Sequence, residues 1–400
     1  MLTKTILPAI VAFHIGLSAA DVCSDDEVSI NSSADAEALS SCDTIEGTVT
    51  IGTQASGEIS IDGPDSIDGD LICEDNGALT TLSSSSLTSI GGSFTMRNVT
   101  ALTTLTMSKL SSVTTLDWQT LARLETVTFA DEGLTEADTI RISDTFLSTL
   151  NAFSVTSPKK MEIDNNRRLT EWDSGLETLS DELVITANGF GLQVSFPDLV
   201  WIANMTISNV SDITVPSLEV VNGSMRFDSN FFTDFSAPNM TNTQDGDISF
   251  TGNSGLANVS FPLLTTVAGG FTIANNTKLE AIDGFPELKT IGGAVKLRGN
   301  FTTVELPSVN DVKGAFDISS TSNIDDVCSE FEDLSSSGGS GKIQGTFTCS
   351  SNNENANDVN SDGSSSGGDG DDESSSVVFG FSLPVAFSIA ALGCLAQAVM

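Results

Sequence analysis

Histidine, the commonest general base, and cysteine, the strongest side-chain nucleophile, are both scarce in this 400-residue chain. The chain has six cysteines and one histidine, His14, which lies in an N-terminal segment that we expect to be removed. A mature chain without histidine excludes Ser-His-Asp and Cys-His catalysis and most zinc sites. We therefore expect a protein that is not an enzyme, with no catalytic residue, no metal site and no cofactor.

Carboxylates are abundant instead, with 54 acidic residues against 16 basic ones and a net charge of −38. Nucleic acid is excluded as a partner, because phosphate binding needs a basic surface. Glycoside chemistry needs only two carboxylates about 5–10 Å apart, and so many acids form such pairs by chance. A glucan-remodelling transglycosidase therefore stays an alternative, while the simpler interpretation of the charge is a well-solvated surface.

Four cysteines flank a long central region. Cys23 and Cys42 precede it and Cys328 and Cys349 follow it, so we expect one disulfide at each end in a secreted, oxidising context. Cys73 occupies an apolar position and is expected to be a buried free thiol. A competing pairing of Cys42 with Cys73 stays open, because a sequence alone does not fix connectivity.

N-glycosylation is the other chemistry that the residues predict, at nine Asn-x-Ser/Thr sequons. The expected acceptors are Asn31, Asn98, Asn204, Asn209, Asn222, Asn239, Asn258, Asn275 and Asn300.

Both ends of the chain carry processing signals. Lys4 precedes an apolar run at 6–17, which predicts a signal peptide over 1–20. A polar stretch at 361–376 precedes an apolar tail at 377–400 with no basic residue after it, as in a GPI-attachment signal. The alternative, a single membrane-spanning helix, lacks the usual Lys/Arg flank. The expected attachment residues are Gly363, Ser364, Ser365 and Ser366.

One phrase recurs along the central region: Gly, any residue, apolar, any residue, apolar, two residues, Asn. The copy Gly223-Met225-Phe227-Asn230 shows it clearly. Alternating apolar residues that recur every 20–24 residues predict a solenoid, whose coils bury their inward faces by stacking. The first positions of the thirteen expected coils are Gly47, Gly69, Gly92, Thr114, Asp138, Lys159, Asp181, Ala203, Gly223, Gly246, Gly269, Gly293 and Gly314.

The positions of prolines and asparagines support this division of the chain into coils. Six prolines precede a first position by six to eight residues, where a turn is expected because proline cannot donate to a strand ladder. Phe and Leu beside them are expected to fill the interior. Asn at the eighth position of the phrase is expected to turn inward as a ladder, because with one exception it is never a sequon. The exception is Asn300, which we expect to be glycosylated least.

The predicted fold is mainly β, a right-handed parallel β-solenoid with leucine-rich-repeat-like coils, short capping helices and disulfide-stapled ends. Its expected parts are a signal peptide (1–20), an N-terminal cap (21–46), the solenoid (47–324), a C-terminal cap (325–350), a disordered stalk with the GPI-attachment region (351–366) and a removed tail (367–400).

The turns that read FPxL or VPxL, the segment Phe261–Val267, the segment Ile273–Pro286 and the paired terminal cysteines together resemble a known family. This family comprises the fungal GPI-anchored cell-wall organisation proteins. They are also described as the "extracellular mutant"/sporulation-specific group, and they have receptor L-domain-like repeats. The resemblance implies a glycoprotein of the outer plasma membrane leaflet and the cell wall that serves wall integrity. It also implies wall polysaccharide or wall proteins as partners, and it carries no catalytic residues.

Three functions follow. The first is a non-enzymatic, anchored scaffold or interaction protein of the wall, and the second is the transglycosidase. The third is a carbohydrate-binding module, which would favour exposed Trp and Tyr for sugar stacking. The chain has no Tyr, and its three tryptophans are spread out at Trp118, Trp172 and Trp201.

Overall fold

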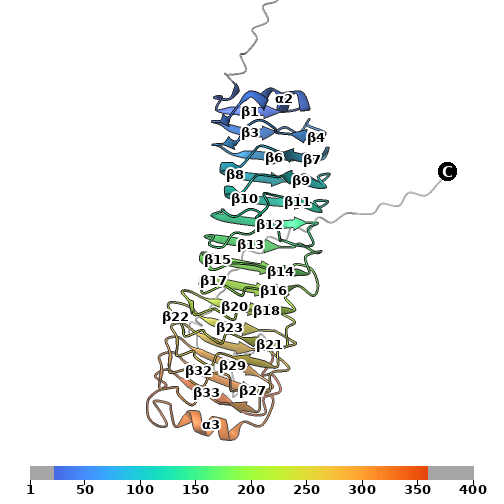
Figure 1. The fold of residues 1–400 in the computed structure, drawn as a ribbon. Coiled ribbons are helices and arrows are strands. Elements are labelled where there is room, and N and C mark those ends of the chain that lie inside the picture. Colours follow the sequence, from blue (N-terminus) through green and yellow to red (C-terminus); the bar gives the residue numbers. More distant parts are fainter. Residues whose placement is uncertain (1–21, 359–400) are drawn as a thin grey trace, which may run out of the picture. The chain divides into compact units, whose positions relative to one another are not determined.

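The computed structural model describes residues 22–358, which form a stack of coils in which all strand pairs are parallel (Figure 1). The expected signal peptide, the four GPI-attachment candidates, the apolar tail and Cys394 lie outside the described residues. The parallel β-solenoid expected from the repeats is confirmed.

The strands of the coils form three rows, although some coils, such as that of β12 (Thr139–Thr145), lack a strand on the second face. The first face is a row of strands in which each main coil pairs with the next, as in the register Phe227↔Phe250↔Ile273. Its strands are β1 (Glu27–Ile30), β3 (Thr48–Ile51), β6 (Leu71–Glu74), β8 (Ser89–Arg97), β10 (Ser112–Leu121), β12 (Thr139–Thr145), β13 (Lys160–Asp164), β15 (Thr178–Thr186), β17 (Trp201–Ser208), β20 (Met225–Asp228), β23 (Ile248–Thr251), β26 (Phe271–Ala274), β29 (Val295–Gly299), β32 (Phe316–Ser320) and β33 (Phe347–Ser350).

The second face follows the first along the chain and is made of shorter sheets. Its strands are β4 (Gly57–Ser60), β7 (Leu79–Ser84), β9 (Thr104–Met107), β11 (Thr126–Thr128), β14 (Glu171–Asp173), β16 (Gln193–Ser195), β18 (Asp212–Thr214), β21 (Asp234–Ser236), β24 (Asn258–Ser260), β27 (Ala281–Ile282) and β30 (Thr303–Val304).

The third face leads back to the first strand of the next coil. In four coils a single long strand, β8, β10, β15 or β17, serves the third and first faces together, with register shifts in β10 and β15. The remaining strands are β2 (Thr44–Ile45), β5 (Ser66–Ile67), β19 (Val220–Val221), β22 (Asn242–Thr243), β25 (Thr266–Val267), β28 (Thr290–Ile291) and β31 (Asp311–Val312).

All thirteen expected first positions precede or lie within a strand of the first face. The two caps add one strand each, because β1 pairs with β3 and β33 pairs with β32. Glycine is required where coils stack tightly at this corner. A Cβ on Gly246, for example, would lie 2.1 Å from the carbonyl carbon of Gly223 in the preceding coil. Thr, Asp, Lys or Ala takes this position in the middle coils.

The interior is filled with apolar side chains, as expected from the alternating pattern. Phenylalanines stack from coil to coil, with ring centroids 4.7 Å apart for Phe227 and Phe250. Trp118 and Trp172 are also buried, and Trp201 is half-buried. The six prolines lie in turns, and in five of them the residue before the proline accepts a backbone hydrogen bond, as Phe285 does from Leu288 at 3.3 Å.

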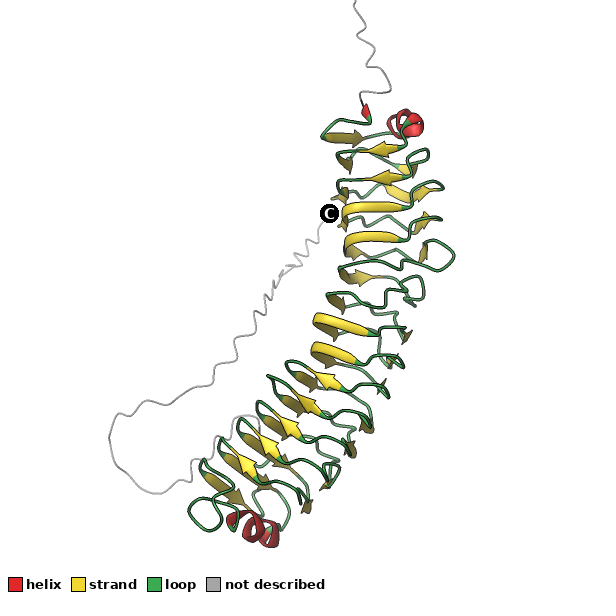
Figure 2. Cartoon of the chain, turned by 60° about the vertical axis from the view of Figure 1, so that its left-hand side comes forward, coloured by secondary structure: helices red, strands yellow, loops and turns green. Residues whose placement is uncertain are grey.

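Short helices lie at opposite ends of the stack (Figure 2). At the first end, the start of α2 (Ser33–Glu37) is capped by side chains, because Ser32 accepts from the Asp35 N–H while Asp35 accepts from the Asn31 N–H. A 3₁₀ turn, η1 (Ala38–Ser41), follows it. At the other end lies α3 (Asp325–Glu332), with Phe331 buried against the last coil.

Each helical end is closed by a disulfide, Cys23–Cys42 and Cys328–Cys349. The competing pairing of Cys42 with Cys73 is therefore wrong. Cys73 is fully buried and is the free cysteine among the described residues.

The expected start of a disordered stalk at residue 351 is also wrong. Residues 351–358 fold back on the last coils, where the Asn353 N–H donates to the Ser320 carbonyl at 2.8 Å and Ala356 is fully buried. The polar composition of this segment predicts disorder, although the segment forms a packed turn. No helix within residues 22–358 has the length and apolar character needed to cross a membrane.

Candidate functional site

The first corner joins the first and second faces and carries the Asn of the repeated phrase. The residue at the seventh position has a positive φ in ten successive coils, from Asp75 (φ 53°) to Asn275 (φ 58°). Asn, Asp and Gly tolerate this left-handed backbone best, which explains why they are frequent here. Part of the sequon signal at this position, in Asn98, Asn209 and Asn275, is thus a backbone requirement.

The eighth-position Asn turns inward, as expected. Asn76, Asn166, Asn230, Asn253 and Asn276 are each at most 2% exposed. Each of the last four donates through Nδ2 to the fifth-position carbonyl of the preceding coil, at 2.9 Å in every case. The ladder therefore satisfies backbone groups that would otherwise be buried without partners.

Asn300 occupies the eighth position of its coil but does not take part in this ladder. The preceding Gly299 lacks the positive φ, and Phe301 takes the buried place. The Asn300 side chain is half-buried, donates to the Thr277 carbonyl at 2.8 Å and accepts from Thr321 and Asn357. Both ends of its amide are therefore engaged, but outside the interior.

The other predicted acceptors divide by exposure. Asn31, Asn98, Asn222, Asn239 and Asn258 are exposed, while Asn204, Asn209 and Asn275 are half-buried. No sequon lies between residues 99 and 203, so the middle coils carry none. Glycosylation of the nine residues stays a proposal.

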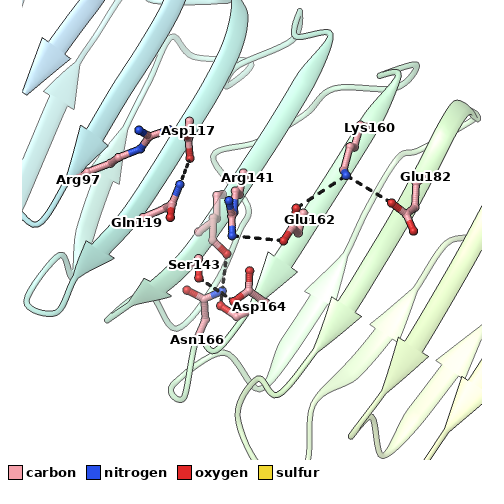
Figure 3. A network of polar contacts seen from close by, with 11 residues as sticks. Arg97, Asp117, Gln119, Arg141, Ser143, Lys160, Glu162, Asp164, Asn166 and Glu182 are labelled. Carbon is pink, nitrogen blue, oxygen red and sulfur yellow. Dashed lines mark hydrogen bonds and ion pairs between the residues drawn. The ribbon is translucent and has the colours of Figure 1, made fainter. Parts of the chain in front are cut away.

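The outer side of the first face carries a network of charged side chains in these middle coils (Figure 3). Lys160 lies between Glu162 and Glu182, with nitrogen–oxygen distances of 3.9 and 3.3 Å. Arg141 pairs with Glu162 at 3.5 Å, and Arg97 pairs with Asp117. Charges of opposite sign thus meet on neighbouring strands. Because these side chains are at most half-buried and remain in contact with water, each pair contributes about 0–1 kcal/mol to stability and mainly helps to fix the register of neighbouring strands.

Two carboxyl groups have pKa values shifted in opposite directions. Burial raises the pKa of Asp228 above its ordinary 3.8, against the lowering effect of the Arg226 charge. Hydrogen bonds from the Ser60 hydroxyl and from Ser85 lower the pKa of Asp62. The two groups lie on different faces and do not form an acid–base pair. The described residues contain no group of three or more His, Cys, Asp or Glu that could hold a metal ion.

A shallow hollow of about 330 Å³ lies on the second face over β14, β16 and β18. Glu171, Asp173, Gln193 and Asp212 line it with polar side chains. Trp172 also lines it, is 1% exposed, and its indole N–H has no hydrogen-bond partner among the described residues. The Trp172 ring packs in the interior against the buried Phe196, with ring centroids 5.2 Å apart, so the side chains that the hollow presents to solvent are the carboxylates and the amide.

Exposed phenylalanines are the feature that the repeat pattern does not predict, because it assigns most Phe to the core. Phe190 is 87% exposed, Phe231 is 42% exposed and Phe146 is 36% exposed. All three follow the eighth position at the first corner. The only local signal is Gly189-Phe190-Gly191, in which two glycines flank an aromatic residue.

Comparison with known proteins gives curated relatives along most of the chain. It is 35% identical to "Protein ecm33" of Aspergillus fumigatus, with 86% of this chain and 85% of that protein covered. It is 35% identical to "Cell surface GPI-anchored protein" of Arthroderma benhamiae, with 87% of each covered. It is 30% identical to "Cell wall mannoprotein PST1" of Saccharomyces cerevisiae, with 79% and 70% covered. No protein-family model and no solved structure matches the chain.

Proposed function

Because the chain belongs to the fungal Ecm33 family of GPI-anchored cell-surface and cell-wall proteins, we propose that it is an anchored wall glycoprotein. In this proposal it organises the wall as a non-enzymatic scaffold or interaction protein. Its place is the outer leaflet of the plasma membrane and the cell wall. Its partners are wall polysaccharide or wall proteins.

The observation that carries the scaffold proposal is the filled interior closed at both ends. Apolar side chains occupy the inside of every coil, and a helix and a disulfide close each end. Enzymes that act on a saccharide typically hold the reacting bond in a well-formed cleft, between two carboxyl groups placed on either side of it. The hollow on the second face is shallow and open, which favours contact along a surface over reaction.

The anchor is part of the proposal. Attachment at one residue of 363–366 would replace the apolar tail with a lipid and would hold the solenoid at the cell surface. The sequons on the outer surface would carry N-glycans after passage through the secretory pathway.

A complementation experiment tests this function. A fungal strain that lacks its own family member would receive the full chain or a form that ends at Ser376, which lacks the apolar tail. We expect the full chain to restore resistance to a wall-binding dye and to glucanase digestion, and the shortened form to be secreted without effect. Full rescue by the shortened form would contradict an anchored role, and no rescue by either would contradict the wall role.

A further inference from the structure

Two pairs of planar side chains lie along the first corner between the coils of β12 and β20, and together they make up a row. The row consists of Phe146 with Arg168, whose guanidinium also pairs with Glu125 at 3.7 Å, and of Phe190 with Phe231. The Arg168 guanidinium carbon lies 4.3 Å from the centroid of the Phe146 ring, and the rings of Phe190 and Phe231 are 5.8 Å apart. Four strand spacings separate the ends of the row, which therefore spans about 20 Å.

The backbone holds Phe190 out of the interior. A Cβ on Gly189 would lie 2.3 Å from the Leu169 carbonyl oxygen, and Gly191 has a φ of +87°. The Leu192 N–H closes the turn by donating to the Gly189 carbonyl at 3.1 Å. A ring that is 87% exposed in water is unfavourable, so two glycine-dependent backbone features that keep it there point to a ligand that covers it.

The row of planar side chains borders the hollow on the second face. Gln193 follows Phe190 by three residues, and Glu171 follows Arg168 by three. The hollow therefore places acceptors and donors for hydroxyl groups within about 10 Å of the row along the chain, a distance that two sugar units of an extended polymer span.

We propose that the first corner from Phe146 to Phe231, together with this hollow, binds an extended chain of neutral sugars. This proposal deepens the proposed function and depends on it for a ligand in the wall. Sugar rings present flat C–H faces that stack on aromatic rings, and their vicinal hydroxyls donate to carboxylates and amides. Glu171, Asp173 and Asp212 would repel an anionic polymer, so the chemistry selects a neutral one such as β-glucan.

The sequon nearest to the rings provides a second saccharide that must be distinguished. Asn209-Val210-Ser211 lies in the coil between Phe190 and Phe231, and the Phe231 N–H donates to the Val210 carbonyl at 2.8 Å. A glycan on Asn209 would lie close to both rings. The proposal commits to a wall polysaccharide, and occupation by this glycan is an outcome of the test.

The test measures binding of β-glucan and chitin oligosaccharides to the secreted chain ending at Asp358, by isothermal titration calorimetry. We expect binding, with affinity reduced about 2- to 10-fold by Phe190→Ala or Phe231→Ala and further by the double variant. Leu263→Ala is the matched control, because Leu263 is 49% exposed but lies in a turn after the second face. It should leave the affinity unchanged.

Each other result overturns the proposal. If the folded protein binds no oligosaccharide, either with Asn209 intact or as the Asn209→Gln variant, the proposed site does not exist. Binding that appears only in Asn209→Gln assigns the rings to the glycan of the protein itself. Equal losses in Phe190→Ala and Leu263→Ala assign the effect to general surface hydrophobicity. None of these results changes the complementation outcome for the full chain, so failure of the site and failure of the wall function are separable.

Discussion

The Oδ1 atom of Asn253 accepts a hydrogen bond from the backbone N–H of Asn230 in the preceding coil, at 2.9 Å. Its Nδ2 atom donates to the Phe227 carbonyl at the same distance, and Asn276 repeats the arrangement one coil later. A single buried side chain thus connects neighbouring coils at the first corner. The repeated Asn is a structural residue of the solenoid.

Replacing Asn253 with Ala should destabilise the protein by about 2–4 kcal/mol, because a buried N–H and a buried carbonyl both lose their partner. The midpoint of urea unfolding measures the loss. Asn310→Ala is the control, since Asn310 is exposed, and it should change stability by less than about 0.5 kcal/mol. Equal effects of the two substitutions would show that the ladder contributes nothing.

Glycan occupancy should be lowest at Asn300 among the nine sequons. Its amide nitrogen donates to the Thr277 carbonyl, and its amide oxygen accepts from Thr321 and Asn357, so glycosylation must compete with three hydrogen bonds. Asn222 is exposed and should be occupied far more. A glycopeptide map by mass spectrometry compares the two. Full occupancy of Asn300 would contradict the packing of 351–358 against it.

Cys73 should be unreactive in the folded protein. Burial raises the pKa of its thiol to about 12, and the charge of Glu74 adds to the shift. Iodoacetamide at pH 8 should therefore label Cys73 only after unfolding, as read by mass spectrometry on the chain ending at Asp358. Cys73→Ser should cost about 1–3 kcal/mol by burying a hydroxyl, whereas Cys73→Val keeps the position apolar. Rapid labelling of the folded protein would disprove the buried position.

Asp228 and Asp62 should give opposite dependences of stability on pH. The folded protein holds the Asp228 proton more tightly than the unfolded chain, so Asp228 lowers stability as pH rises from 3.8 through its raised pKa. Asp228→Asn should therefore raise the melting temperature at pH 7 and leave it unchanged below pH 3.8. The pKa of Asp62 is lowered, so its contribution is present above 3.8 and is lost as pH falls through the folded pKa.

Asp62→Asn provides the internal control for this prediction. It should lower the melting temperature at pH 7, because hydrogen bonds from Ser60 and Ser85 to the carboxylate are weakened. A scan from pH 3 to pH 8 compares both variants with the unaltered protein. A lower melting temperature of Asp228→Asn at pH 7 would contradict the direction assigned to Asp228.

The repeated positions could be predicted because each coil contacts only its neighbours, so a residue type that fits one coil fits the next. Gly246, Pro286 and Asn253 show this for the three kinds of corner. Positions that depend on an irregular neighbour could not be predicted. Phe190 projects outward because of a local turn between two glycines, and Ala356 is buried by a polar segment that folds back. Neither the exposure of Phe190 nor the burial of Ala356 can be predicted from the periodicity of apolar residues.

Incubation of the secreted chain ending at Asp358 with defined β-glucan and chitin oligosaccharides tests the non-enzymatic account most directly. Mass spectrometry would follow the length distribution of the sugars over time, with the folded state checked by circular dichroism. The account predicts an unchanged distribution, even for oligosaccharides that bind. Shorter or longer products that disappear in Glu171→Gln or Asp212→Asn would contradict it and would make the hollow on the second face an active site.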